Sequence, residues 1–138
     1  MPTASLLLLT TSRRMSPEVA LRRNVENALA ASTLERDPEL AERLIRHQGE
    51  RPTDRKALSA LASAGARYYG GTGQTRIRAG TLVVHGMADT VVDPRNAGLL
   101  VQRIPQAELL MLPDAGHLFF WEDPDTFVSA VSRFLLRP

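Results

Sequence analysis

The feature that most constrains this chain is a strand–helix–strand pattern in its carboxyl-terminal half. Residues 82–84 form a short apolar, β-rich run that ends at His85-Gly86, and residues 108–112 form a second buried run. Between them, Asp93-Pro94 marks the start of a helix with apolar residues at helical spacing: Ala97, Leu100, Val101 and Ile104. A crossover of this length joins parallel strands, so the loops after both strands leave the sheet at the same edge.

Each of these two loops carries a side chain suited to acid–base chemistry. Asp89 follows the first strand, and His117 follows the second, 28 residues later. Neighbouring parallel strands bring such positions within side-chain reach at the carboxyl edge, where open α/β sheets place their sites. A buried carboxylate beside an imidazole fixes the ring's tautomer and stabilises the imidazolium. Asp93 is an alternative acid, but it directly precedes Pro94 and is better explained as a helix cap, so we favour Asp89.

Residues 16–69 are predicted to form helices in succession. Ser16-Pro17 and Asp37-Pro38 each place a capping side chain before a proline at the first helical position, and Thr53 is a possible third cap. One-faced apolar patterns follow these positions: Leu21, Val25, Ala28 and Leu29; Leu40, Leu44 and Ile45; Leu58, Leu61, Gly65 and Tyr68.

The glycine-rich stretch at residues 70–73 ends the helical pattern. We place a boundary there, between a helical, cap-like region of residues 1–75 and a β-α-β-α region of residues 76–138. Asp123-Pro124 begins the last helix of the second region. Five apolar residues are expected on the inner face of that helix: Phe127, Val128, Val131, Phe134 and Leu135.

Composition excludes several other classes of protein. The 138 residues suffice for one ordinary soluble domain, and all but one of the 17 basic residues are arginines scattered among 15 acids, so we expect no nucleic-acid or membrane partner. The chain has no cysteine, which excludes disulfides and thiolate chemistry and fits the cytoplasm. The apolar run of residues 6–9 is too short for a signal peptide or a membrane span, and its position right after Met1 suggests that something once preceded it.

The remaining histidines and the aromatic residues receive no catalytic role. The three histidines are too far apart, without ligands at suitable spacing, to predict a metal site, and His85 and His47 are assigned no function. Five aromatic residues could line a substrate pocket but are more often part of a core: Tyr68, Tyr69, Phe119, Phe120 and Trp121.

Two motifs in this order resemble the carboxyl-terminal part of an α/β-hydrolase. Residues 82–89 match an apolar strand followed by His-Gly, two variable residues and the catalytic Asp. Residues 113–117, Pro-Asp-Ala-Gly-His, match the later loop that ends in the catalytic His, and residues 119–124 are also typical of that family. The resemblance implies a partial α/β-hydrolase fold, with a helical cap before a parallel β-α-β unit and a carboxyl-terminal helix. It implies Asp89 and His117 as the catalytic pair of a triad, and no cofactor.

The sequence departs from this family at the nucleophile. The family carries it on a Gly-x-Ser-x-Gly turn between a strand and a helix, upstream of the cap. The nearest imitation, residues 61–65 around Ser63, lacks the first glycine and lies within a helical pattern, so we reject it. The segment that donates an oxyanion-hole amide is also missing.

Two hypotheses follow from this departure. The first is the carboxyl-terminal portion of a hydrolase of ester, lactone or related bonds, inactive alone and acting on a small ester-like substrate only when a nucleophile-bearing segment completes it. The second is a non-catalytic remnant that dimerises or complements a partner fragment, because the open strand edge and the apolar surface would be buried by pairing.

Overall fold

The structure is a computed structural model that describes residues 15–50, 54–67 and 72–137. Four helices come first: α2 (Pro17–Ala28), α3 (Ala31–Arg36), α4 (Pro38–Gly49) and α5 (Arg55–Arg67). They are followed by η2 (Thr72–Arg76), β1 (Thr81–Gly86), α6 (Arg95–Arg103), β2 (Ala107–Leu112), α7 (Phe119–Glu122) and α8 (Pro124–Leu135). Within the described ranges, no helix has the length and apolar character needed to cross a membrane.

Three helices begin at the capping residues that the sequence indicates. Ser16, Asp37 and Asp123 each accept a hydrogen bond, at 3.1–3.3 Å, from the backbone N–H three residues further on. Each is followed by a proline at the first helical position. Thr53 and the apolar run of residues 6–9 lie outside the described residues.

The helices α2 and α4 pack together around a small apolar core. Its buried members are Val25, Leu29, Leu40, Ala41 and Leu44. Leu118, which directly follows His117 in sequence, also packs against this core. The helical region and the sequence around the predicted base therefore share one packing unit.

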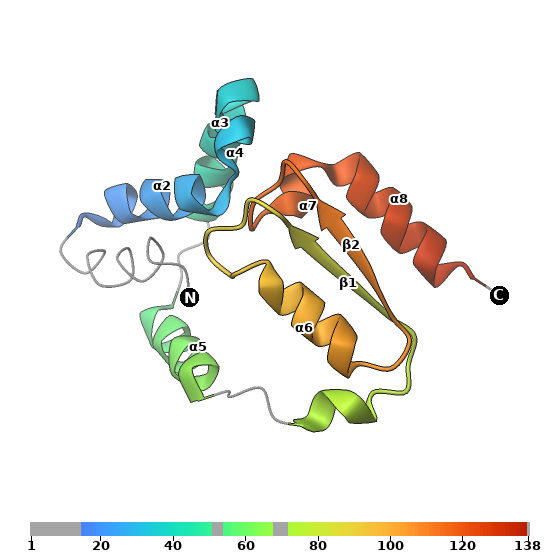
Figure 1. Ribbon diagram of the computed structural model, residues 1–138. Helices are drawn as coiled ribbons and strands as arrows, with labels where there is room; N and C mark the ends of the chain where they lie inside the picture. Colours follow the sequence, from blue (N-terminus) through green and yellow to red (C-terminus); the bar gives the residue numbers. More distant parts are fainter. Residues whose placement is uncertain (1–14, 51–53, 68–71, 138) are drawn as a thin grey trace.

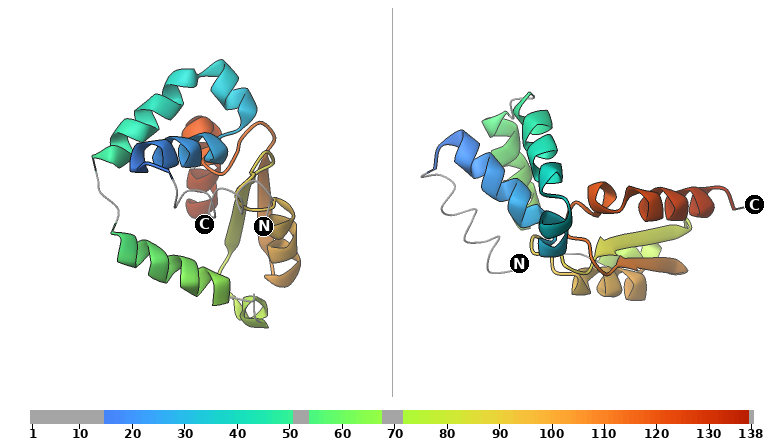
Figure 2. Two further views of the ribbon diagram at one scale, coloured as in Figure 1. Left: turned by 90° about the vertical axis from the view of Figure 1, so that its left-hand side faces the viewer. Right: turned by 90° about the horizontal axis from the view of Figure 1, so that it is seen from above.

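The sheet consists, in the described part of the chain, of β1 and β2 in parallel, with Thr81 opposite Ala107 and Gly86 opposite Leu112. Both views show α6 on one face of this pair and α8 on the other (Figures 1 and 2). The carboxyl ends of the two strands point toward α2, α3 and α4 (Figure 1). The predicted parallel β-α-β unit and terminal helix are thus present, while the boundary near residue 75 stays a prediction.

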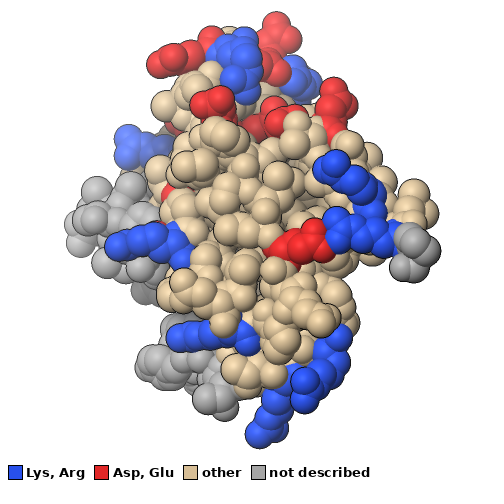
Figure 3. Space-filling view, turned by 45° about the vertical axis from the view of Figure 1, so that its right-hand side comes forward, with Lys and Arg blue, Asp and Glu red and all other residues tan. Residues whose placement is uncertain are grey.

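Burial differs from the expectation at three apolar positions of β2 and α8. Leu109 of β2 is exposed, so the prediction of a fully buried strand is wrong at this residue. Val128 and Leu135, expected on the inner face of α8, are also exposed. The physical reason is that the described sheet has two strands, too little surface to cover every apolar residue of β2 and α8. Figure 3, which brings the α8 side forward, shows a central area of uncharged residues with charged ones mostly around its rim.

Candidate active site

The loops that follow β1 and β2 are held together by backbone contacts. The N–H groups of Met87 and Ala88 donate to the carbonyls of Leu112 and Ala115, both at 2.9 Å. The approach is so close that a Cβ at Gly86 would lie 2.2 Å from the carbonyl oxygen of Gly116. Only glycine fits there, which gives the glycine of the His85-Gly86 pair a steric explanation.

Asp89 is buried at this junction, with 2% of its side chain exposed. Its Oδ1 accepts hydrogen bonds from the backbone N–H groups of Val91 (2.7 Å) and Val92 (2.9 Å). Its Oδ2 lies 2.9 Å from Nδ1 of His117. The expected proximity of the Asp89 and His117 side chains is confirmed, and these donors offset the cost of burying a carboxylate.

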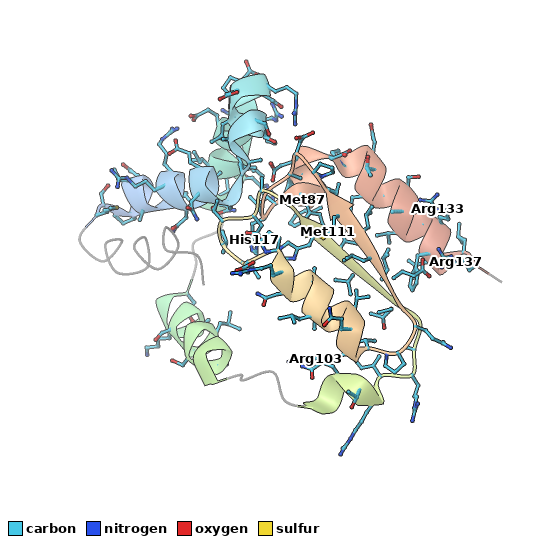
Figure 4. The ribbon with its side chains drawn as sticks, in the orientation of Figure 1. Met87, Arg103, Met111, His117, Arg133 and Arg137 are labelled. Atoms are coloured by element: carbon cyan, nitrogen blue, oxygen red, sulfur yellow. The ribbon has the colours of Figure 1, made fainter. Side chains whose placement is uncertain are left out.

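His117 projects from the second loop, with 41% of its side chain exposed. Its backbone N–H donates to the carbonyl of Ala28 at 2.8 Å, and so does that of Leu118 at 3.1 Å, which ties the residue to the end of α2. Figure 4 shows His117 and Met87 near the carboxyl ends of the strands, away from Arg103, Arg133 and Arg137.

The contact with Asp89 determines what the His117 ring can do. Because a carboxylate only accepts hydrogen bonds, Nδ1 of His117 carries the proton, and in the neutral ring the lone pair lies on Nε2. Nε2 is therefore the atom that can take a proton from a reacting group. The resulting imidazolium would be stabilised by the Asp89 carboxylate.

His85 is a member of this site that the sequence analysis left without a role. Its Nε2 lies 3.0 Å from Oδ2 of Asp89 and 3.3 Å from the carbonyl oxygen of Val92. Both neighbours are acceptors, so this nitrogen carries a proton. His85 thus helps to orient the Asp89 carboxylate. Its position at the end of a strand, four residues before the acid, was the available sequence signal.

Asp93, the alternative acid, is bound elsewhere. Both of its carboxylate oxygens contact the guanidinium of Arg95, and Oδ1 also accepts from the backbone N–H of Arg95 at 3.0 Å. The hydrogen bonds from Arg95 lower the pKa of Asp93 to about 2. The helix α6 begins at Arg95 with Pro94 as its capping residue, so Asp93 stabilises the first turn from one position further out than expected.

The other candidate residues lie outside the Asp89–His117 pair. Ser63 lies within α5, as the helical pattern predicts. Trp121 and Phe120 are exposed, whereas the ring of Phe119 packs edge-on against Phe127, and Tyr68 and Tyr69 are outside the described residues. Among the described residues, no group of three or more His, Asp or Glu side chains is arranged to hold a metal ion.

Comparison with known proteins defines the class of this chain. The sequence profile of the alpha/beta hydrolase fold matches residues 5–124, which is most of the sequence. The chain therefore belongs to the alpha/beta hydrolase fold family, and the fold class implied by the two motifs is confirmed.

Particular relatives match parts of their own length. The chain is 37% identical over 54 residues to the pimeloyl-[acyl-carrier protein] methyl ester esterase of Nitrosospira multiformis, covering 39% of this chain and 20% of the esterase. It is 44% identical over 63 residues to a 2-hydroxy-6-oxononadienedioate/2-hydroxy-6-oxononatrienedioate hydrolase of Escherichia coli, covering 45% and 22%.

Among solved structures, a thermophilic esterase from Thermogutta terrifontis is similar, with a TM-score of 0.75 and 25% identity. The match covers 96% of this chain and 48% of the esterase. The chain thus spans about half of the esterase structure, and its alignments cover about a fifth of each of the two curated relatives named above.

Proposed function

We propose that this chain supplies the general base and its orienting acid to a hydrolase that cleaves an ester, a lactone or a related bond. The observation that carries the proposal is the buried Asp89 carboxylate bound to Nδ1 of the partly exposed His117, at the carboxyl edge of parallel strands. The substrate class rests on the likeness to a methyl ester esterase and a thermophilic esterase.

In the proposed reaction, Nε2 of His117 takes the proton of an attacking hydroxyl as that oxygen bonds to the substrate carbonyl carbon. Asp89 stabilises the imidazolium through Nδ1. The imidazolium then gives the proton to the leaving group, and a second passage with water releases the acid. His85 holds the carboxylate in the orientation that this exchange needs.

The nucleophile of the proposed reaction comes from outside these 138 residues. The sequence has no Gly-x-Ser-x-Gly turn, and Ser63, in the nearest imitation of it, lies within a helix. A cavity of about 330 Å³ lined by Arg36, Asp114 and Glu122, among others, has neither Asp89 nor His117 in its wall. This cavity is therefore separate from the proposed acid–base pair.

The proposal that the nucleophile lies outside these residues is tested by hydrolysis of an activated ester by the 138 residues alone. We expect no turnover above background, because an acid–base pair without a nucleophile and an oxyanion hole can only assist water. Turnover that disappears in His117→Ala would contradict the proposal, and labelling with a fluorophosphonate would then identify the nucleophile within this chain.

Exposed apolar residues support a partner surface for the nucleophile-bearing segment. Phe120 and Trp121 of α7 and Val128 and Leu135 of α8 are all exposed, and β1 pairs with β2 along one edge. Exposed large apolar side chains that gather in one surface are typical of an interface. Without that segment, two copies are expected to associate through it. A monodisperse monomer in light scattering that also unfolds cooperatively in urea would contradict this association of two copies.

A further inference from the structure

Glu122, the last residue of α7, binds groups from two distant parts of the chain. Its Oε1 accepts a hydrogen bond from the backbone N–H of Gly116 at 2.8 Å. Its Oε2 accepts from the backbone N–H of Ala30 at 2.8 Å and from the hydroxyl of Thr33 at 2.7 Å. One carboxylate therefore joins the loop that carries His117 to the connection between α2 and α3.

Glu122 lines the cavity of about 330 Å³ on one side, but the groups that it binds are closely packed. Thr33 is 1% exposed, so its hydroxyl is well shielded from solvent. A Cβ at Gly116 would lie 2.8 Å from the carbonyl oxygen of Ala28 and 2.8 Å from the nitrogen of Ala30. At this spacing, a displacement of the α2–α3 connection must displace the Gly116 backbone as well, because interiors deform little.

The three donors require a carboxylate in particular. An ionised carboxylate has two oxygens that accept only, so it can serve all three donors. A glutamine would direct its NH₂ group either at the N–H of Gly116, which opposes one donor, or at the N–H of Ala30 and the hydroxyl of Thr33, which opposes two. Glu122→Gln keeps the size of the side chain and removes one half of this bridge.

We propose that Glu122 is a positioning residue that holds His117 in place for proton transfer and couples its position to the α2–α3 connection. This inference rests on the proposed function of His117 as the base. Glu122 acts through the Gly116 amide and touches no reacting atom. The mechanical consequence is that movement of the helical region changes the distance between His117 and Asp89.

The alternative is that Glu122 only stabilises the fold. Both alternatives predict a lower stability for Glu122→Gln, so stability does not distinguish them. They differ in the folded protein: a positioning role predicts that the Nδ1 proton of His117, shared with Asp89, changes its NMR resonance. A purely structural role leaves that resonance unchanged in folded molecules, whereas the Gly116 amide, which binds Glu122 directly, responds to Glu122→Gln in both cases.

The experiment is a double-mutant cycle of Glu122→Gln and Thr33→Val in the full chain, with Glu18→Gln, an exposed carboxylate in the first turn of α2, as the control. The readouts are the hydrogen exchange rate of the Gly116 amide and the His117 Nδ1 proton resonance. Glu122→Gln is expected to accelerate the exchange of Gly116 at least tenfold, as loss of a hydrogen bond to a charged acceptor predicts. Glu18→Gln is expected to change neither readout.

Thr33→Val is the decisive variant, because it acts on the far side of the bridge. It is expected to accelerate Gly116 exchange severalfold and shift the His117 resonance when Glu122 is present, and to do neither in Glu122→Gln. The contact of Arg36 with the Thr33 hydroxyl is lost in both backgrounds and cancels in the cycle. If Glu122→Gln does not fold, Thr33→Val alone tests the positioning role: changes in both readouts support it, and unchanged readouts overturn it.

The outcomes separate this inference from the proposed function. Equal effects of Thr33→Val in both backgrounds, or a folded Glu122→Gln with an unchanged His117 resonance, would overturn the positioning role. A parent chain in which the His117 Nδ1 proton is not bonded to Asp89 would instead count against the proposed function. In that case, Gly116 exchange still reports whether Glu122 links the two segments.

Discussion

Replacing Asp89 with asparagine tests how the acid controls the base. In the parent, Oδ2 of Asp89 accepts from Nδ1 of His117 and Nε2 of His85. An NH₂ group at that position opposes both donors. Rotating the amide by 180° places the NH₂ group opposite the backbone N–H groups of Val91 and Val92 instead, so donors again face donors. The simplest relief is for His117 to move its proton to Nε2, so that Nδ1 accepts and the lone pair needed at Nε2 disappears.

The size of the effect follows from these contacts. Each hydrogen bond to a charged group is worth about 1.5–3 kcal/mol when its partner is buried. The full value applies to His85, whose side chain is 15% exposed, and a reduced value to His117, which is 41% exposed and can turn toward solvent. We therefore expect Asp89→Asn to lower the free energy of unfolding by about 2–4 kcal/mol.

Two measurements check this prediction. Urea denaturation gives the change in stability, and long-range ¹H–¹⁵N correlation spectra near pH 8, where an ordinary imidazole is neutral, give the tautomer of His117. The reasoning is refuted if His117 keeps its proton on Nδ1 in a folded Asp89→Asn variant. It is also refuted if the parent ring already carries its proton on Nε2.

Two further predictions concern the surroundings of the site. Gly116→Ala is expected to lower the free energy of unfolding by about 1–3 kcal/mol in urea denaturation, because its Cβ would meet the backbone of residues 28–30. Gly98→Ala in α6 has open space around the new Cβ and is expected to raise that free energy by about 0.5–1 kcal/mol. Similar values for the two variants would contradict the close packing at Gly116. The lowered pKa of Asp93 gives a small stabilisation that is complete above its ordinary value of 3.8 and is lost as the pH falls to about 2. At low salt, Asp93→Asn is expected to remove this loss of stability at acid pH, measured as the urea midpoint against pH. An unchanged profile would show that Arg95 does not bind this carboxylate in solution.

Local sequence signals predicted the parts of the fold that depend on neighbouring residues. Ser16, Asp37 and Asp123 cap helices because the side chain and the N–H it binds are three residues apart. The Asp89–His117 contact was also accessible, since parallel strands fix where their following loops emerge.

Features that depend on distant residues were not accessible in this way. The chain leaves helical geometry at Leu29 and Ala30, although apolar residues continue at helical spacing through Leu29. The N–H of Ala30 binds Glu122, 92 residues away, so tertiary contacts stabilise a break that local propensity does not show. The exposure of Leu109 and Val128 likewise depends on how much of a sheet is present to cover them.

The proposed role of His117 is tested most directly by ester turnover in a fusion of these 138 residues to the part of the Thermogutta terrifontis esterase that lies outside the matched 48%. The fusion and the chain alone are assayed on one activated ester, each with and without His117→Ala. We expect turnover by the fusion only, and a loss of that turnover by a factor of about 10³ or more in His117→Ala. A folded fusion without turnover, or turnover that survives His117→Ala, would contradict the assignment of His117 as the base.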